Sequence, residues 1–387
     1  MHDEIRTKRQ DALSSLKRGV ESGGIPALED VKCMVDFLME VSVYADTLEN
    51  EASQTFEEDN AIFAATSTLL SCGDVLHDAD VLRTIAQRMA DNPWAFHGDP
   101  ERLSISATGG ERVNRTLYVS LAVGIICSLF VPTVVQGNRA VTGCSCGKCA
   151  ESDIVEAGGY DISDRTYPEA TLCAHRFAYL HAQKFHPILW RFAHQRGHLG
   201  FHDFCKIGAG IAEPSASAYR YLAVWEDELS RCAASALNRL EGTTLPKSVA
   251  LTGGEMIDES LDGSFIHVSD SAIRPMRIDA AEIRLEADAE RHPGEDADTR
   301  KYAFNMQVRS ELARLLRILD GSQDATAERE LVTVNAAIAL FASQGISGVA
   351  CPREAMTRVR EAICRGTALD KCRQILPLAE EVASSGT

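Results

Sequence analysis

Residues 104–162 constrain the fold of this chain more than any other stretch. A short β-type run over residues 103–106 is followed by a tight turn, Thr108-Gly109-Gly110, and a helix is expected to start near Thr116. A second strand is expected over residues 131–135. Paired glycines let backbone N–H groups approach a ligand closely, and a helix N-terminus carries partial positive charge. This order of elements predicts an α/β sheet with a phosphate-binding loop.

The second strand leads into another polar loop at its carboxyl end, Gln136-Gly137-Asn138-Arg139. In open α/β sheets, ligands bind beside the carboxyl ends of the strands. Two such loops within one strand–helix–strand unit therefore predict a cleft for a phosphorylated ligand. The alternative is that the glycine pair only makes a turn, because glycine pairs mark turns in many folds.

Composition excludes some classes of partner. The formal net charge is −17 over 387 residues, and binding to nucleic acid needs clustered Lys and Arg, so a nucleic-acid partner is not expected. The apolar run over residues 117–135 is about as long as a membrane span, but Gly124 and Pro132 divide it into a buried helix and a buried strand. The N-terminus lacks the apolar core of a secretory signal. We therefore expect no membrane contact, a cytoplasmic location and reduced cysteines.

The expected fold class is α/β, with a small N-terminal helical domain and a larger domain built on a mostly parallel central sheet flanked by helices. The helical domain is expected over residues 1–98 and the α/β domain over residues 99–387. Apolar residues recur at helical spacing in the first domain over residues 5–20, 27–44, 57–70 and 78–89, with Asp78 or Asp80 as a helix cap.

Further elements are expected in the α/β domain. A strand over residues 219–225, a helix over 227–240 and a strand over 247–252 make a βαβ unit. Residues 278–300 are acidic and predict an exposed connection, whereas residues 331–342 are apolar on nearly all sides and predict a buried helix.

Several of these segments resemble the anthranilate phosphoribosyltransferase family and its relatives, the pyrimidine nucleoside phosphorylases. The family patterns GTGGDG, KHGNRAVSS and GSAD leading into VLEALG are similar to residues 107–110, 137–142 and 152–159. The patterns FLFAPxYHPAM…VRxxLG, GxDGLDE and VLLNAAxAL are similar to residues 184–200, 253–259 and 331–340. In patches, the resemblance covers residues 60–376.

The resemblance implies a function. It implies a phosphoribosyltransferase that transfers a 5-phosphoribosyl group from 5-phosphoribosyl diphosphate to a small aromatic or carboxylated, anthranilate-like acceptor, with Mg²⁺ as the cofactor. It also implies a homodimer formed through the helical domain, on which parts of residues 165–190 would pack. Because the transition state of such a transfer is oxocarbenium-like, catalysis needs metal ions, backbone amides and positioning more than a strong base.

The resemblance also assigns site residues. The implied donor and phosphate ligands are Thr108, Gly109, Gly110, Ser120, Gly137, Asn138 and Arg139. The implied acceptor ligands are Asn138, His186 and Arg196, and the implied magnesium ligands are Asp258, Glu259 and Ser120. Hydroxyl and carboxylate oxygens suit Mg²⁺, and the arginine fork suits a carboxylate. The alternatives are a solvated acidic loop for the carboxylates, a structural histidine for His186 and a surface ion pair for Arg196.

The chain departs from the family pattern on the donor side. GTGGDG is replaced by Ala-Thr-Gly-Gly-Glu-Arg, Tyr118 stands where the family has asparagine, and Val135 stands where KHG has its lysine. These changes favour a divergent transferase of specialised metabolism. A nucleoside-phosphorylase-like enzyme is the alternative, and a non-catalytic relative acting as a binding protein is another.

A loop longer than the family's carries Cys144, Cys146 and Cys149. This C-x-C-x-x-C pattern is compatible with zinc or an iron–sulfur cluster if Cys173, His175 or Cys205 supplies a fourth ligand. A reactive cysteine and simple packing in a glycine-rich loop are the alternatives.

Overall fold

The computed structural model contains one seven-stranded sheet with the strand order β3-β2-β1-β4-β5-β6-β7. The first five strands in this order pair in parallel, and β6 and β7 add an antiparallel edge. The strands are β1 (Leu103–Ala107), β2 (Thr133–Gly137), β3 (Phe177–His181), β4 (Tyr219–Ala223), β5 (Ser248–Thr252), β6 (Ser264–Ser269) and β7 (Ala272–Arg277). The structure describes residues 2–47, 53–72, 74–91, 94–96, 98–108, 118–139, 149–199, 201–241, 245–254, 258–280, 283 and 297–385. This mostly parallel sheet confirms the predicted fold class.

Helices cover both faces of the sheet, because successive strand residues point to opposite sides. Tyr221 of β4 packs in one core cluster with α5 (Val119–Cys127) and α14 (Thr326–Ala342), whereas the next residue, Leu222, packs in the other. The first cluster is also covered by α6 (Glu151–Ala157), α7 (Tyr167–His175), α13 (Ala297–Leu319), α16 (Pro352–Cys364), α17 (Thr367–Ile375) and α18 (Ala379–Ser384). The short helix α15 (Gln344–Ser347) follows α14.

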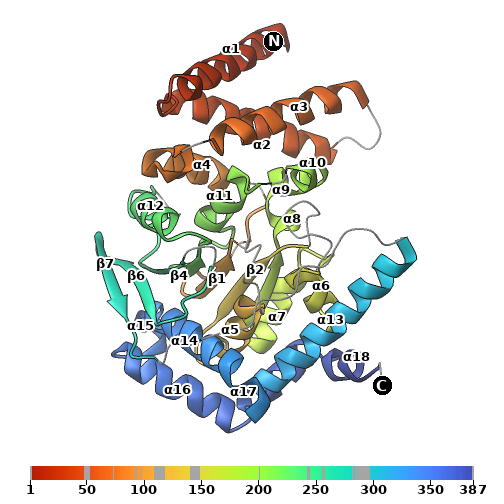
Figure 1. Cartoon of the computed structure of the whole chain (residues 1–387), viewed down its shortest axis with the longest axis vertical. Coiled ribbons are helices and arrows are strands. Elements are labelled where there is room, and N and C mark those ends of the chain that lie inside the picture. The colour runs from red at the N-terminus through yellow and green to blue at the C-terminus, as the bar shows by residue number, and fades with distance from the viewer. Residues whose placement is uncertain are drawn as a thin grey trace.

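The second core cluster joins the N-terminal helices to the opposite sheet face. Helix α4 (Ala79–Ala90) packs against α11 (Phe204–Ala212) and α12 (Asp227–Leu237), and α2 (Leu28–Thr47) packs against α9 (Pro187–Arg191). The N-terminal helices therefore stand above the sheet in Figure 1. The other helices on this side of the sheet are α1 (His2–Glu21), α3 (Ser53–Leu70), α8 (Ala182–Phe185) and α10 (Ala193–His198). The predicted domain boundary after residue 98 stays a prediction.

Local capping explains where α4 begins. The side chain of Asp78 accepts hydrogen bonds from the backbone N–H groups of Asp80 and Val81, both at 2.9 Å. These two donors would otherwise have no partner in the first turn of the helix. The sequence allowed either Asp78 or Asp80 as the cap of this helix, and the structure shows that it is Asp78.

The second strand is shifted from its expected position, and one hairpin was not expected. The second strand runs over Thr133–Gly137, two residues later than predicted, because it starts after Pro132 and pairs with β3 as far as the register Gly137↔His181. The hairpin β6–β7 was not predicted. Its turn residues Asp270 and Ser271 have φ values of 50° and 60°, a conformation usually signalled by glycine or asparagine.

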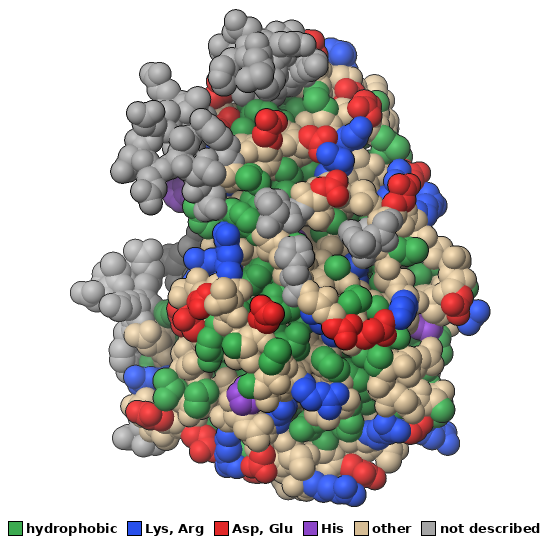
Figure 2. All heavy atoms as spheres, turned by 180° about the vertical axis from the view of Figure 1, so that it is seen from behind, with side chains coloured by type: hydrophobic (Ala, Val, Ile, Leu, Met, Phe, Trp, Pro, Cys, Tyr) green, Lys and Arg blue, Asp and Glu red, His purple; other side chains and the backbone are tan. Residues whose placement is uncertain are grey.

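The structure also bears on the expected buried helix, acidic connection, membrane span and surface charge. The buried helix is confirmed, since every residue from 331 to 342 is buried within α14. Residues 297–300, expected in an acidic connection, belong to α13, and the segment before them lies largely outside the described residues. Among the described helices, none has the length and apolar character needed to cross a membrane. On the face shown in Figure 2, basic side chains lie among acidic ones rather than in one continuous patch.

Candidate functional site

The predicted site loops follow the carboxyl ends of neighbouring parallel strands. Thr108 follows β1, and its backbone N–H and hydroxyl both donate to the carbonyl oxygen of Ala223 on β4, at 2.9 and 3.1 Å. This double contact fixes the base of the predicted glycine turn against the next strand. The turn itself, Gly109-Gly110, lies outside the described residues.

Gly137, the last residue of β2, is packed too tightly for a side chain. A Cβ atom there would lie 2.2 Å from the Tyr179 hydroxyl oxygen and 2.5 Å from Oε2 of Glu151. Ser120, in the first turn of α5, donates a hydrogen bond to Oε1 of Glu151 at 3.0 Å. Glu151 is itself buried. Ser120 and Gly137, both expected to bind phosphate, thus share a carboxylate that the sequence reading missed, although Glu151 lies at the serine position of the GSAD pattern.

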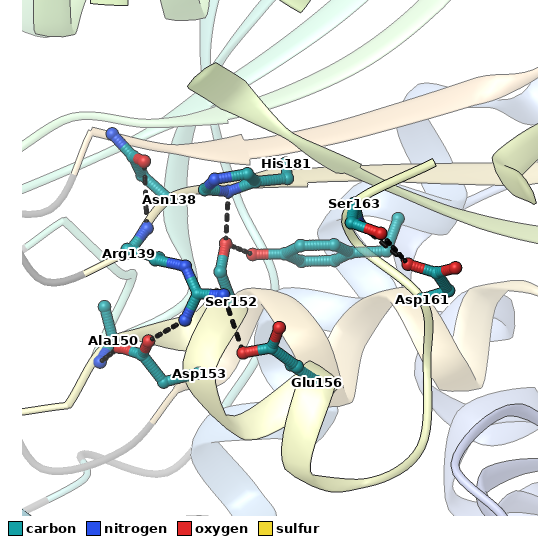
Figure 3. Close-up of polar contacts among 10 residues, drawn as sticks. Asn138, Arg139, Ala150, Ser152, Asp153, Glu156, Asp161, Ser163 and His181 are labelled. Atoms are coloured by element: carbon teal, nitrogen blue, oxygen red, sulfur yellow. Dashed lines mark hydrogen bonds and ion pairs between the residues drawn. The ribbon is translucent and has the colours of Figure 1, made fainter. Parts of the chain in front are cut away.

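The loop after β2 is held by α6 (Figure 3). The backbone N–H of Ser152 donates to the carbonyl oxygen of Asn138 at 3.2 Å. The Arg139 guanidinium donates to Oδ1 of Asp153 at 2.9 Å and to Oε2 of Glu156 at 2.6 Å. Burial lowers the pKa of Arg139, but the hydrogen bonds and charges of Glu156 and Asp153 outweigh it and raise the pKa. A phosphate oxygen would therefore have to compete with two carboxylates for this side chain.

His186 lies in the interior beside Gln136, the residue before Gly137. Its Nε2 atom is 3.1 Å from the amide nitrogen of Gln136. Burial, and then the positive charge of Arg196, lowers the pKa of His186 from 6.5 to about 3. The ring is consequently neutral at pH 7, so Nε2 accepts from the amide and Nδ1 carries the proton. Nδ1 has no hydrogen-bond partner within the described part of the chain.

Arg196 forms a buried ion pair, and the alternative of a surface pair is wrong. Its Nε donates to Oδ2 of Asp203 at 2.9 Å, and the two side chains are only 3% and 4% exposed. Oδ1 of Asp203 also accepts from the backbone N–H of Cys205 at 2.9 Å, which caps α11. The Asp203 carboxylate therefore both orients the predicted acceptor arginine and caps the N-terminus of α11.

The predicted metal carboxylates follow β5. Asp258 is 1% exposed and Glu259 is half-buried, so an exposed acidic loop is wrong for Asp258. The hydroxyl of Thr252 donates to the backbone carbonyl of Asp258 at 3.2 Å. Burial raises the pKa of Tyr221 well above its ordinary value, and the charges of Glu259 and Asp258 raise it further. This end of β5 thus collects negative charge in a water-poor environment.

Asn335 of α14 anchors the same loop, a role that sequence reasoning missed. Its Oδ1 accepts from the Tyr221 hydroxyl at 2.6 Å and from the backbone N–H of Ser260 at 3.0 Å. Its Nδ2 donates to the Ser260 carbonyl at 3.1 Å. The signal was present in the Asn-Ala-Ala resemblance, because a polar residue on an otherwise apolar buried helix needs partners.

The cysteine loop is described only at its end. Cys149 is buried, its backbone N–H donates to Oε1 of Gln307 at 3.0 Å, and the Tyr118 hydroxyl donates to its carbonyl oxygen. Cys149 and Cys205 belong to different core clusters, which argues against a shared metal. Cys144 and Cys146 lie outside the described residues, and the described residues contain no group of three or more His, Cys, Asp or Glu that could hold a metal ion.

Comparison with known proteins finds a matching family model and several similar proteins. The family model described as "Glycosyl transferase family, a/b domain" matches residues 100–369. An anthranilate phosphoribosyltransferase of Alkaliphilus metalliredigens is 26% identical over 290 residues, covering 73% of this chain and 78% of that protein. One from Sulfurisphaera tokodaii is 33% identical over 158 residues, which span 40% of this chain and 44% of that relative.

The fold is shared with a solved structure. Anthranilate phosphoribosyltransferase from Saccharomyces cerevisiae, in complex with PRPP and Mg, superimposes with a TM-score of 0.70 at 17% identity. The match covers 96% of this chain and 98% of that one.

Proposed function

This chain belongs to the glycosyl transferase family, and we propose that it transfers a 5-phosphoribosyl group from 5-phosphoribosyl diphosphate to a small aromatic or carboxylated acceptor. The bond from ribose C1 to the diphosphate oxygen breaks, and a bond from C1 to the acceptor nucleophile forms. The observation that carries this proposal is the cluster at the carboxyl end of β2, where Ser120 and Gly137 both approach Glu151 and His186 contacts Gln136, in a chain of this family.

The donor set fits Mg²⁺. Asp258 and Glu259 supply carboxylates after β5, and Ser120 supplies a hydroxyl in α5, the ligand types that Mg²⁺ prefers. Glu151, which accepts the hydrogen bond from Ser120, is a buried carboxylate that does not form one cluster with Asp258 and Glu259 in the described structure. Bound Mg²⁺ would neutralise the diphosphate as it leaves. The presence of PRPP and Mg in the S. cerevisiae complex supports this choice of donor and metal.

On the acceptor side, we assign binding to Asn138, His186 and Arg196. The neutral His186 and the charged Arg196 lie close enough for the arginine to lower the histidine pKa. Both are buried, so a bound acceptor would meet them in a low-dielectric environment where hydrogen bonds and charge pairing are strong. The name of the relatives supports an anthranilate-like acceptor.

We also propose a cytoplasmic homodimer with a helical domain over residues 1–98 as its contact. Ile25 and Leu28, in and beside the α1–α2 connection, are 55% and 37% exposed, which supports an apolar contact surface there. Sedimentation equilibrium of wild-type protein and of Ile25→Glu tests this assembly. A monomeric wild-type protein would contradict it.

Turnover tests the proposed transfer. Purified protein is incubated with 5-phosphoribosyl diphosphate, Mg²⁺ and a panel of anthranilate, salicylate and nicotinate, and diphosphate release is measured. Acceptor-dependent release is expected, and chelation of Mg²⁺ should stop it. Phosphorolysis of a pyrimidine nucleoside with inorganic phosphate, in the absence of diphosphate release, would instead establish the phosphorylase alternative.

A further inference from the structure

A buried hydrogen-bond chain orients His181, a residue to which no role has yet been given. The Ser152 hydroxyl lies 2.9 Å from the Tyr179 hydroxyl and 2.9 Å from Nδ1 of His181 (Figure 3). Ser152 and Tyr179 are fully buried, and His181 is 5% exposed. Within the described part of the chain, the His181 side chain hydrogen-bonds to Ser152 alone. One ring nitrogen is thus fixed, and the other remains available to a ligand.

The hydrogen bonds among Tyr179, Ser152 and His181 determine which ring nitrogen of His181 carries the proton. The two distances fit either direction; because a phenol is a stronger hydrogen-bond donor than an aliphatic hydroxyl, we take Tyr179 to donate to Ser152 and Ser152 to donate to Nδ1 of His181. Donors aligned in one direction polarise one another and strengthen the chain. Burial, together with the charges of Arg139 and Lys184, lowers the pKa of His181 to about 4, so the ring is neutral. Its single proton then resides on Nε2, which becomes a donor.

The fold places this donor beside a predicted substrate loop. His181 ends β3 and pairs in register with Gly137 of β2, so Asn138 is the next residue along the neighbouring strand. In Figure 3 the His181 ring extends from β3 toward Asn138. Aligned on His186-Pro187, the FLFAPxYHP pattern has phenylalanine at the positions of Tyr179 and His181. The polar chain is therefore a departure of this sequence from the pattern that it otherwise resembles.

We propose that His181 donates a hydrogen bond from Nε2 to an oxygen of the acceptor, and that Ser152 and Tyr179 are positioning residues for its ring. This inference rests on the proposed phosphoribosyl transfer and narrows its acceptor. The preferred acceptor carries a carboxylate, carbonyl or other hydrogen-bond-accepting oxygen, and an aromatic amine without such an oxygen binds poorly.

Titration calorimetry with anthranilate and with 5-phosphoribosyl diphosphate tests this role in the full-length protein. His181→Phe should weaken anthranilate binding by about tenfold to a hundredfold, because a hydrogen bond to a charged oxygen is lost. Donor affinity should change by less than about twofold, which is within ordinary context effects. Ser152→Ala should weaken anthranilate binding less, by about threefold to tenfold, because the ring keeps its donor but loses its orientation.

Two conservative variants separate a binding role from a packing role. The amide nitrogen of His181→Gln can reach the position of imidazole Nε2, whereas that of His181→Asn reaches only the position of Nδ1. The inference predicts that Gln retains more anthranilate affinity than Asn does. It is overturned if His181→Phe binds anthranilate as wild type does, if Asn and Gln are equally impaired, or if His181→Phe loses both substrates together.

The tautomer is tested without any ligand. In ¹⁵N-histidine-labelled protein, His181 should show a protonated Nε2 and an unprotonated Nδ1, and the opposite tautomer would overturn the inference. Wild-type protein that binds 5-phosphoribosyl diphosphate but no carboxylated acceptor would overturn this inference alone. Wild-type protein that binds anthranilate but no donor would contradict the proposed transfer instead.

Discussion

Arg196 and Asp203 form a buried ion pair that ties the end of α10 to the beginning of α11, with 2.9 Å between Nε and Oδ2. Because both side chains are almost fully removed from solvent, removing one of the two charges is costly for the other. The predicted acceptor arginine is therefore also part of the structural framework. Its two roles have to be separated experimentally.

Asp203→Asn should destabilise the protein by about 3 kcal/mol, because it removes the buried carboxylate charge that faces Nε of Arg196. Urea denaturation measures the loss. Asp227→Asn is the matched control, since Asp227 pairs with Arg231 at a site where both side chains are more than half exposed. That control should cost less than about 1 kcal/mol. Equal losses in the two variants would contradict a special role for the buried pair.

His186 should make stability depend on acid pH. Its folded-state pKa of about 3 lies below its ordinary value of 6.5, so the unfolded chain takes up the proton first as the pH falls. Its contribution to stability is therefore fully present above pH 6.5 and is lost as the pH falls toward about 3. The slope is at most about 1.4 kcal/mol per pH unit.

Urea midpoints between pH 7 and pH 5 test this slope. His186→Gln should reduce the pH dependence of these midpoints. If His186→Gln keeps the wild-type slope, the buried neutral ring is not its source.

Gly137→Ala tests the tight contact at the end of β2. The added methyl group would lie 2.2 Å from the Tyr179 hydroxyl, which predicts a loss of about 1–3 kcal/mol from overpacking. Tyr179→Phe in the same chain should restore part of this loss, because it removes the nearest atom. Gly254→Ala provides the control, since nothing lies within 4 Å of its added Cβ. Thermal unfolding that ranks the two alanine variants equally would argue against the described packing.

Asn335→Ala should remove the hydrogen bonds that hold the loop carrying Asp258. The change removes both the acceptor for the Ser260 N–H and the donor to the Ser260 carbonyl, at a fully buried position. Leaving these groups unsatisfied should cost about 2–3 kcal/mol. Mg²⁺-dependent donor affinity should fall as well, whereas Tyr221→Phe, which removes only one partner of Asn335, should have a smaller effect on both quantities. Unchanged donor affinity in Asn335→Ala would show that the hydrogen bonds of Asn335 do not support donor binding.

Much of the fold could be predicted because its signals are local. The short apolar runs at β1, β4 and β5 and the largely apolar residues 331–342 of α14 are close to where the sequence placed them. The family resemblance is confirmed by the match over residues 100–369. The β6–β7 hairpin was not predicted, because its positive-φ turn is made by Asp270 and Ser271 without glycine.

The site was less predictable because its partners are distant in sequence. The motif named Ser120, but not its contact with Glu151, 31 residues away. It named Asp258, but not Asn335, which fixes the neighbouring Ser260 from 75 residues away. Such contacts depend on which helix packs over which strand end, and no local spacing encodes that.

Donor binding tests the central claim most directly. Calorimetric titration of 5-phosphoribosyl diphosphate into wild-type protein should show binding with Mg²⁺ and little without it. Asp258→Asn should abolish the metal-dependent part, and Asp262→Asn, four residues along and partly exposed, should preserve it. Absence of wild-type binding at about 1 mM donor with Mg²⁺, the upper end of common KM values, would contradict phosphoribosyl transfer by this chain.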